Sequence, residues 1–449
     1  MQLPYAGVEF TSTGAVAKPD QLDAALALAQ GQGQGQGQGD APTHLIVMCH
    51  GWNNTIPEAE GLYTRLGDHI AQQQTDRDVR LAVIGLLWPS VRWSDDQGEI
   101  AGGGLAVGDP ATELAARIDD TVDDPGAAAA LKAQVGDLEA SHDARVRFVE
   151  TIRQHLLPPA ESVSDDDPIP SRFLEGDVEE LFDEAELGFL GLMNPGGEVP
   201  ATGQAADVGV AGPAADVGVG GPPADLGATG AAAGLFGGGV SPIVIARFLL
   251  NMGTYYQMKA RAGAVGTNGA SQLLTKVRDA VAVPVTLVGH SFGARVVSAA
   301  AGNGAPAHAM CLLQGAFSHY AFDDAHGPLG QAGAFRRAVQ GGALDGPIVV
   351  THSQKDLAIR FAYAIASRIA QQTASGLGGP DDKYGGLGAN GAVGMPAAEV
   401  QAMDLGPLGT MYAFTTHRIY NVAGDAFITG HSAVDGPEVA NAVRQAVLA

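Results

Sequence analysis

Cysteine and basic residues are scarce in this chain of 449 residues. Only two cysteines occur, Cys49 and Cys311, and each lies in a short apolar run, so a disulfide framework is excluded and two buried thiols are expected. Lysine and arginine number 25 against 49 acidic residues, which gives a formal net charge of −24. A surface of that sign repels phosphate backbones and anionic lipid headgroups, so we do not expect the protein to bind nucleic acid.

Long hydrophobic runs are missing as well. Residues 1–5 have neither the basic region nor the apolar stretch of a secretory signal. The longest uncharged tract, 226–246, is dominated by glycine and alanine and contains Pro242, which makes it a poor membrane span. We therefore expect a soluble, cytoplasmic protein with no transmembrane segment, and export without a signal peptide stays open.

Motifs for metals and nucleotides are also absent. The sequence contains no Walker loop, no His-Glu-x-x-His and no Cys-x-x-Cys, so it implies no cofactor and no metal. Residues 386–391 fit Gly-x-Gly-x-x-Gly, but no predicted strand precedes them. A dinucleotide site is therefore not expected there.

What the chain does contain is a series of short apolar runs that alternate with helical patterns. Residues 44–49 and 79–88 are typical of buried strands, and the helical pattern at 57–74 between them completes a βαβ unit with parallel strands. Five or six parallel strands alternating with helices predict a doubly wound α/β sheet. Later strands are predicted at 283–288, 309–314, 348–351 and 411–422, and later helices from 243 to 261, at 273–281, after 291, at 357–371 and at 439–447.

The α/β pattern breaks between residues 95 and 241. Eleven acidic residues and one basic residue occupy 161–186, and a nine-residue unit occurs twice in 205–222. Apolar spacing within 127–157 indicates helices, and the alternating Gln and Gly of 30–39 form a linker. We therefore predict three parts: an N-terminal segment at 1–43, an α/β core at 44–95 and 246–449, and an acidic, Gly-rich cap or lid insertion at 96–245.

The most informative motif is Gly289-His290-Ser291-Phe292-Gly293. It directly follows a predicted strand and directly precedes a helical pattern. Glycines two positions before and after the serine remove Cβ atoms that would clash in a sharp turn, so the hydroxyl stands exposed above the sheet. Gly-x-Ser-x-Gly is a weak signal in a chain with 63 glycines, but this context predicts Ser291 as a nucleophile.

A nucleophilic serine needs a base and an acid, and in such a sheet both come from loops at the carboxyl ends of strands. His431 follows the last predicted strand, whereas His417 lies within it, so His431 is the predicted base. Asp356 comes just after the strand at 348–351 and is the predicted acid, although an Asp there is also a good helix N-cap. Two alternatives for the acid stay open, Asp404 and Asp425.

The remaining parts of such a site are donors for an oxyanion and a pocket for the substrate. The expected donors are the backbone N–H of Phe292 and that of Trp52, which follows Gly51 at the end of the first buried strand. The predicted pocket residues are His50, Trp88, Trp93 and Phe317. Aromatic residues near the predicted strand ends suggest a substrate with a substantial apolar part, and these are Trp52, Trp88, Trp93, Phe317 and Tyr320.

In this order the motifs resemble the α/β-hydrolase superfamily, and more narrowly a bacterial branch with a His-Gly-Trp-Asn signature that is close to serine esterases and lipases. The resemblance covers 44–95 and 246–449. It is carried by His50–Asn54, Trp88–Ser90, Arg261–Gly266, Gly289–Gly293 and the tail with His431.

The resemblance implies Ser291 as nucleophile, Asp356 as acid and His431 as base, with Trp52 and Phe292 at the oxyanion hole. It implies a small-molecule or lipid-like ester as substrate and no cofactor. The same triad serves transacylases and amidases, and a non-catalytic module whose acidic insertion binds a basic partner is an alternative from another class. Neither acyl-chain preference nor oligomeric state follows from the sequence.

Overall fold

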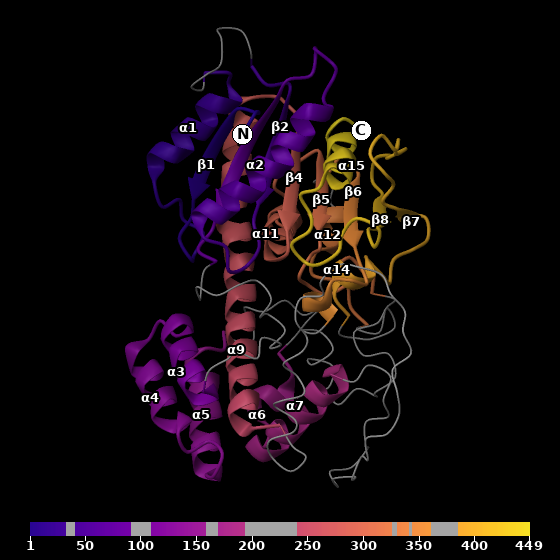
Figure 1. The fold of residues 1–449 in the computed structure, drawn as a ribbon. Helices are drawn as coiled ribbons and strands as arrows, with labels where there is room; N and C mark the ends of the chain where they lie inside the picture. The colour runs from indigo at the N-terminus through magenta and orange to yellow at the C-terminus, as the bar shows by residue number, and fades with distance from the viewer. Residues whose placement is uncertain are drawn as a thin grey trace.

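The computed structural model describes residues 1–32, 41–90, 109–158, 169–193, 240–325, 330–340, 344–360 and 385–449. These residues form one eight-stranded sheet in which every neighbouring pair is parallel, in the order β1-β3-β2-β4-β5-β6-β8-β7 (Figure 1). The strands are β1 (Tyr5–Glu9), β2 (His44–Cys49), β3 (Leu81–Leu87), β4 (Val285–His290), β5 (Ala309–Leu313), β6 (Ile348–His352), β7 (Val400–Asp404) and β8 (Ile419–Ala423).

Helices cover both faces of the sheet, and the alternation of side chains along the strands explains why. In β2, Leu45 and Val47 belong to one buried apolar cluster, whereas Ile46 belongs to another on the opposite face. The first cluster packs against α1 (Pro19–Ala29), the end of α9 (Pro242–Ala264), η2 (Val265–Ala270), α10 (Ser271–Ala280), α11 (Phe292–Gly302) and α12 (Arg336–Gln340). The second packs against α2 (Ile56–Gln73) and α15 (Pro437–Val447).

Two strands at the edges of the sheet are additions to the predicted set. The strand β1 comes from the segment 1–43, which was expected to precede the core, and it pairs with β3. The strand β7 pairs with β8 at the other edge. Both strands are largely half-buried or exposed, so they lack the continuous apolar run that marks a central strand. The N-terminal segment is therefore part of the α/β core.

The strand expected at 411–422 is shorter in the structure. It begins only at Ile419, and residues 411–418 form a loop. His417 lies in this loop with φ of 57°, at the end of the sheet where β8 begins. It is therefore at the opposite end of β8 from the loop that carries His431.

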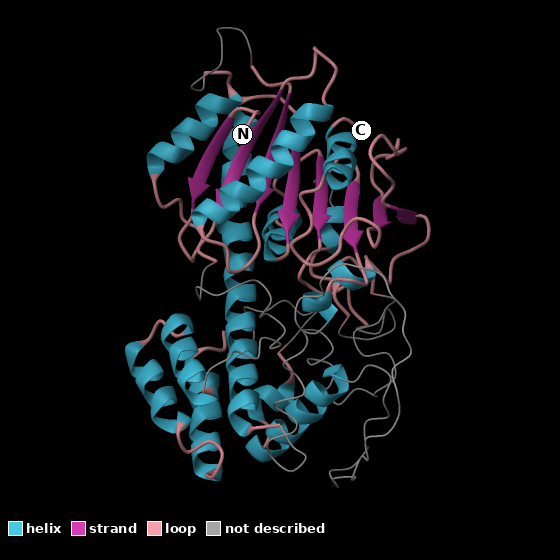
Figure 2. Ribbon diagram, in the orientation of Figure 1, coloured by secondary structure: helices cyan, strands magenta, loops and turns pink. Residues whose placement is uncertain are grey.

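A third apolar cluster contains no residue of the sheet. It contains α3 (Pro110–Thr121), α4 (Pro125–Val135), α5 (His142–His155), α6 (Ser171–Glu175), α7 (Val178–Met193) and the first half of α9. In Figure 2 this helical unit lies beyond the arrowheads of the strands, at the carboxyl-end edge of the sheet. The helix α9 joins the two parts, because Tyr256 belongs to the helical cluster and Met258 to the sheet cluster.

The boundary of the insertion therefore differs from the expected one at residue 245. Residues 240–256 pack with the helical unit, and one uninterrupted helix carries the chain back to the sheet. Several predicted features lie outside the described residues, namely most of the Gln-Gly segment at 30–39, the repeats at 205–222, part of the acidic run at 161–186 and the helix expected at 357–371 beyond residue 360.

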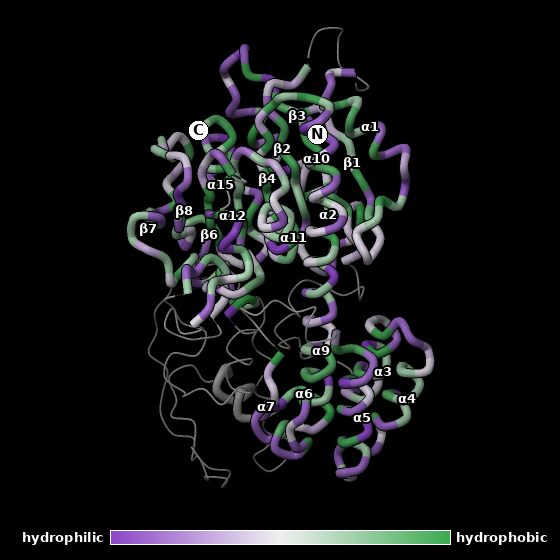
Figure 3. The backbone as a smooth tube through the Cα atoms, turned by 180° about the vertical axis from the view of Figure 1, so that it is seen from behind, coloured by the Kyte–Doolittle hydropathy of each residue, from purple (hydrophilic) through white to green (hydrophobic). Residues whose placement is uncertain are grey.

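Hydropathy follows this architecture. Figure 3 shows hydrophobic stretches along the strands and hydrophilic stretches on the outer turns. Within the described ranges, no helix combines the length and the apolar character that crossing a bilayer requires.

Candidate active site

The order of the strands reverses direction at one point of the sheet. From β2 the chain crosses to β3 on one side, and from β4 it crosses to β5 on the other side. The carboxyl ends of β2 and β4 therefore flank a topological switch point, which is where open α/β sheets bind ligands. Gly51, which precedes the expected donor Trp52, lies in the loop after β2, and Ser291 follows β4, so both loops of the predicted site meet at this switch point.

Ser291 occupies a strained turn between β4 and α11. Its φ of 56° and ψ of −121° are sparsely populated by non-glycine residues, and such a conformation costs about 1–3 kcal/mol. The flanking glycines are required for steric reasons. A Cβ on Gly289 would lie 2.5 Å from Ala294 Cα, and one on Gly293 would lie 2.2 Å from Cys49 O. The motif therefore forms the strand–turn–helix that its spacing predicts.

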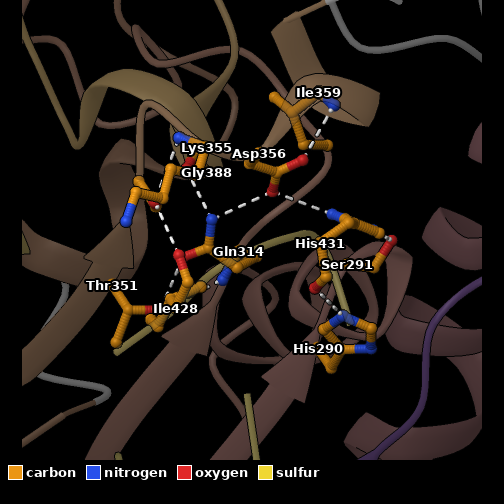
Figure 4. A network of polar contacts seen from close by, with 11 residues as sticks. His290, Ser291, Gln314, Thr351, Lys355, Asp356, Ile359, Gly388, Ile428 and His431 are labelled. Carbon is orange, nitrogen blue, oxygen red and sulfur yellow. Dashed lines mark hydrogen bonds and ion pairs between the residues drawn. The ribbon is translucent and has the colours of Figure 1, made fainter. Parts of the chain in front are cut away.

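Three predicted residues from distant parts of the chain form one hydrogen-bonded series. His431 Nε2 lies 2.8 Å from Ser291 Oγ, and His431 Nδ1 lies 2.9 Å from Asp356 Oδ2. Figure 4 shows the imidazole between the hydroxyl and the carboxylate. Ser291 and Asp356 are buried. Because the carboxylate can only accept, Nδ1 carries a hydrogen and Nε2 of the neutral ring is free to accept from Ser291.

The two oxygens of Asp356 have different partners. Oδ2 accepts from His431 and from Gln314 Nε2 at 2.9 Å, while Oδ1 accepts from the Ile359 amide at 3.0 Å. Burial raises the pKa of this carboxyl, but the charge and hydrogen bond of His431 and the Ile359 and Gln314 donors lower it, and the net pKa lies below its ordinary value. Asp356 thus caps the following turn and also holds the imidazole.

The alternative acids lie elsewhere. Asp404 is the last residue of β7 and is exposed. Asp425 Oδ1 accepts from the Gln354 amide at 2.9 Å and from Ser353 Oγ at 3.5 Å, so it fixes the loop after β6. The structure therefore places Asp356 against His431, whereas Asp425 contacts the backbone amide of Gln354, two residues before Asp356.

His290, to which the sequence assigned no role, is an additional contact of the predicted base His431. Its Nε2 lies 3.0 Å from the carbonyl oxygen of His431, and the two rings are 5.0 Å apart. Burial and the nearby His431 lower the pKa of His290 to about 3, although the hydrogen bond to the His431 carbonyl raises it. A neutral ring that donates from Nε2 to this carbonyl ties the loop of the base to the end of β4.

His50 and Trp88, which we expected to line the substrate pocket, are instead buried in the interior. His50 Nδ1 lies 2.9 Å from Gly51 O, and His50 Nε2 accepts from the Trp88 amide at 3.2 Å. Trp88 Nε1 donates to His50 O at 2.9 Å. Burial lowers the pKa of His50 to about 4, against a smaller opposite effect of the Gly51 hydrogen bond, so the ring is neutral. The pair joins the ends of β2 and β3.

Ser90 holds the turn that carries the expected oxyanion donor. Its hydroxyl accepts from the Asn54 amide at 3.1 Å and donates to Asn54 O at 3.0 Å, and its carbonyl accepts from the Asn53 amide at 3.0 Å. Asn53 has a φ of 59°, so a strained residue stands in this turn as well. Gly51 to Asn54 are thereby fixed against the residues that follow β3.

The other aromatic residues of the predicted site have mainly packing roles. The Trp52 ring is buried and meets Phe292 edge-on, with centroids 5.6 Å apart. Phe317 is buried against Phe335 at 5.0 Å, so it is a core residue and not an open pocket wall. The Phe292 N–H is the first amide of α11 and has no acceptor within the helix, which suits an oxyanion donor. Trp93 lies outside the described residues.

In this series the hydroxyl can pass its proton to the imidazole as Oγ attacks an electrophile, and the carboxylate holds the imidazole in place. In the part of the chain that the structure describes, no three His, Cys, Asp or Glu side chains are grouped as ligands for a metal ion. No family model, no curated protein and no solved structure matches this chain significantly.

Proposed function

We propose that this chain is a serine hydrolase of the α/β-hydrolase type that cleaves carboxylic esters through an acyl-enzyme. The observation that carries the proposal is the series Ser291–His431–Asp356, with hydrogen-bond distances of 2.8 and 2.9 Å, on a strained turn at the switch point of a parallel sheet. A strained serine held against an imidazole is costly to maintain and has a direct use in nucleophilic catalysis.

In the acylation half-reaction, Ser291 Oγ attacks the ester carbonyl while His431 Nε2 takes its proton. The negative charge that develops on the carbonyl oxygen is stabilised by the backbone N–H groups of Trp52 and Phe292. Asp356, ionised because its pKa is lowered, stabilises the imidazolium and keeps its Nδ1–H aimed at Oδ2. The tetrahedral intermediate then collapses, and His431 returns the proton to the leaving alcohol.

In the deacylation half-reaction, water takes the place of the alcohol. His431 removes a proton from the water as its oxygen attacks the acyl carbon. The second intermediate then collapses, the bond to Ser291 Oγ breaks, His431 returns the proton to Oγ, and the carboxylic acid leaves. An alcohol or amine in place of water would give acyl transfer from the same intermediate. The same groups therefore account for hydrolysis and for the alternative of a transacylase.

The assignment to the α/β-hydrolase type is supported by chain order and by position. The three residues follow β4, β6 and β8 in the order Ser, Asp, His, which is the order of that superfamily. The helical unit lies beyond the carboxyl ends of the strands, on the side of the sheet from which the loops with Ser291, Asp356 and His431 leave, and we propose that it is the cap that selects the ester.

Hydrolysis of p-nitrophenyl esters with acyl chains of increasing length tests the proposal. We expect turnover by the full chain and a loss of at least about 10³-fold in Ser291→Ala. Product analysis with competing alcohols or amines separates hydrolysis from acyl transfer. Ester turnover that survives unchanged in Ser291→Ala contradicts the proposal.

A further inference from the structure

Gln314 lies between the proposed nucleophile and the proposed acid. It directly follows β5, the neighbour of β4, and it is fully buried. Its φ of 48° places a non-glycine residue in the left-handed region, which costs about 1 kcal/mol or more. The surroundings therefore hold this residue in a conformation that its own backbone disfavours.

The backbone on both sides of Gln314 is bonded to the nucleophile residue. The Ser291 amide donates to Leu313 O at 3.0 Å, and the Ala316 amide donates to Ser291 O at 3.1 Å. Since these two bonds bracket Gln314, a shift of its turn also shifts the turn of Ser291. The strain at Gln314 and the strain at Ser291 are thus parts of one connected structure.

The side chain of Gln314 is bonded to the acid. Nε2 donates to Asp356 Oδ2 at 2.9 Å and to Gly388 O at 2.8 Å, while Oε1 accepts from Thr351 Oγ1 at 3.1 Å. Because a carboxylate and a carbonyl can only accept, the amide has one possible orientation and both hydrogens of Nε2 are used. Figure 4 shows Gln314 and His431 on the two sides of the Asp356 carboxylate.

We infer that Gln314 is a positioning residue of the proposed hydrolase, which aims the Asp356 carboxylate at His431 and joins it to the turn of Ser291. This inference rests on the proposed function. The buried amide of Gln314 would hold the Asp356 carboxylate in the orientation that His431 needs, and the backbone around it would hold Ser291. Gln314 itself contacts neither His431 nor a reacting atom.

The charges near Asp356 predict an effect on pH dependence. The titratable groups that face the carboxylate within the described residues are His431 and, behind it, His290 at the end of β4, while Asp425 contacts the Gln354 amide. The Gln314 donor neutralises part of the charge on Oδ2. Without it, the undiminished negative charge of the carboxylate faces His431, and we expect the acid limb of the pH–kcat profile to move to higher pH.

Two variants and one matched control test the inference. Gln314→Met keeps the shape and removes both donors, and Gln314→Glu keeps the shape and adds an acid. The control is Gln445→Met in α15, because Gln445 is also buried and its Nε2 donates to Thr410 O at 2.7 Å and to Asn441 Oδ1 at 3.0 Å. Circular dichroism and thermal unfolding show whether each variant is folded.

We expect kcat for a soluble p-nitrophenyl ester to fall about tenfold in Gln314→Met with KM within twofold, the kinetic equivalent of one hydrogen bond to a charged group. The acid limb of the pH–kcat profile should move to higher pH in Gln314→Met and further in Gln314→Glu. Gln445→Met should leave kcat and the acid limb unchanged.

A purely structural role for Gln314 predicts lower stability with an unmoved acid limb, and that result overturns the inference. Wild-type kcat in a folded Gln314→Met also overturns it. If Gln314→Met does not fold, the pH–kcat profile of Gln314→Glu takes its place: an acid limb at higher pH supports the inference, and an unmoved limb overturns it. A wild-type protein without ester turnover contradicts the proposed function instead, so the two failures are distinguishable.

Discussion

Gly51 packs so closely against Ser291 that a Cβ added to it would lie 2.8 Å from Ser291 Cβ and 3.3 Å from Ser291 Oγ. The loop after β2 and the turn after β4 are therefore in direct contact. Trp52 follows Gly51 and Phe292 follows Ser291, so this approach brings together the two loops that carry the proposed oxyanion donors. Glycine at position 51 is required by the close approach.

Gly51→Ala tests this contact. The new methyl group should displace the loop, lower kcat at least tenfold and reduce the free energy of unfolding by about 1–3 kcal/mol. Steady-state kinetics and urea unfolding measure the two effects. The control is Gly136→Ala, where a Cβ meets no atom within 4 Å and φ is −66°. Wild-type kcat in Gly51→Ala would show that catalysis does not depend on the approach.

Asp356→Asn tests the assignment of the acid. The amide retains the shape but presents a donor or a weaker acceptor to His431 Nδ1, so the ring no longer holds the required tautomer, and kcat should fall about 10⁴-fold with little change in KM. Asp404→Asn and Asp425→Asn are the matched controls and should stay within about threefold of wild type. A larger loss of kcat in Asp425→Asn than in Asp356→Asn would transfer the role to Asp425.

Ser90→Ala tests whether the Gly51–Asn54 turn must be held rigid. The substitution leaves the amide and carbonyl of Asn54 without their hydroxyl partner, which should cost about 1–3 kcal/mol of stability and lower kcat several-fold. The matched control is Ser298→Ala. Ser298 is also buried, and within the described residues its hydroxyl has one hydrogen-bond partner, the sulfur of Met310 at 3.8 Å. Equal kcat for the two variants would contradict a positioning role of Ser90.

Two buried histidines predict how stability depends on pH. Burial is the main cause that lowers the pKa of His50 to about 4 and that of His290 to about 3, against an ordinary value of 6.5. Both groups are neutral in the folded state, so their contribution is complete above pH 6.5. As the pH falls below 6.5, the two histidines bind protons in the unfolded chain but stay neutral in the folded chain. The free energy of unfolding therefore decreases until the pH reaches the folded pKa values.

The expected loss is on the order of 3 kcal/mol per histidine between pH 6.5 and pH 4. Urea unfolding across this range measures it. In His50→Asn the slope of unfolding free energy against pH should become shallower, even if the variant is less stable at pH 7. An unchanged slope would mean that His50 is not held neutral by the fold.

Much of the α/β core is predictable because each buried central strand has a continuous apolar sequence. Ser291, Asp356 and His431 each directly follow or closely follow such a run, and the rule that functional loops leave the carboxyl ends of parallel strands places them together. The edge strands β1 and β7 carry no such run, because one edge and much of each face meets solvent. Pattern reasoning therefore misses them.

The supporting residues of the site are harder to predict. Gln314 is one polar residue after an apolar strand, and nothing in the sequence signals its positive φ or its contact with Asp356. His50 and Trp88 show the reverse error. Their aromatic rings and their places at strand ends suggested a pocket, but both side chains are buried and their polar atoms bond to each other's residues and to the Gly51 carbonyl inside the protein. Only three-dimensional hydrogen bonding distinguishes the two cases.

We propose that Ser291 is an activated nucleophile, and labelling by a fluorophosphonate probe measures this reactivity without the need for a known substrate. The serine oxygen displaces fluoride from phosphorus and its proton passes to His431, so labelling needs the same pair as catalysis. We expect mass spectrometry to find one adduct, on the peptide that contains Ser291, with labelling abolished in Ser291→Ala and strongly slowed in Asp356→Asn. An unlabelled wild-type protein, or an adduct that persists in Ser291→Ala, would contradict the account.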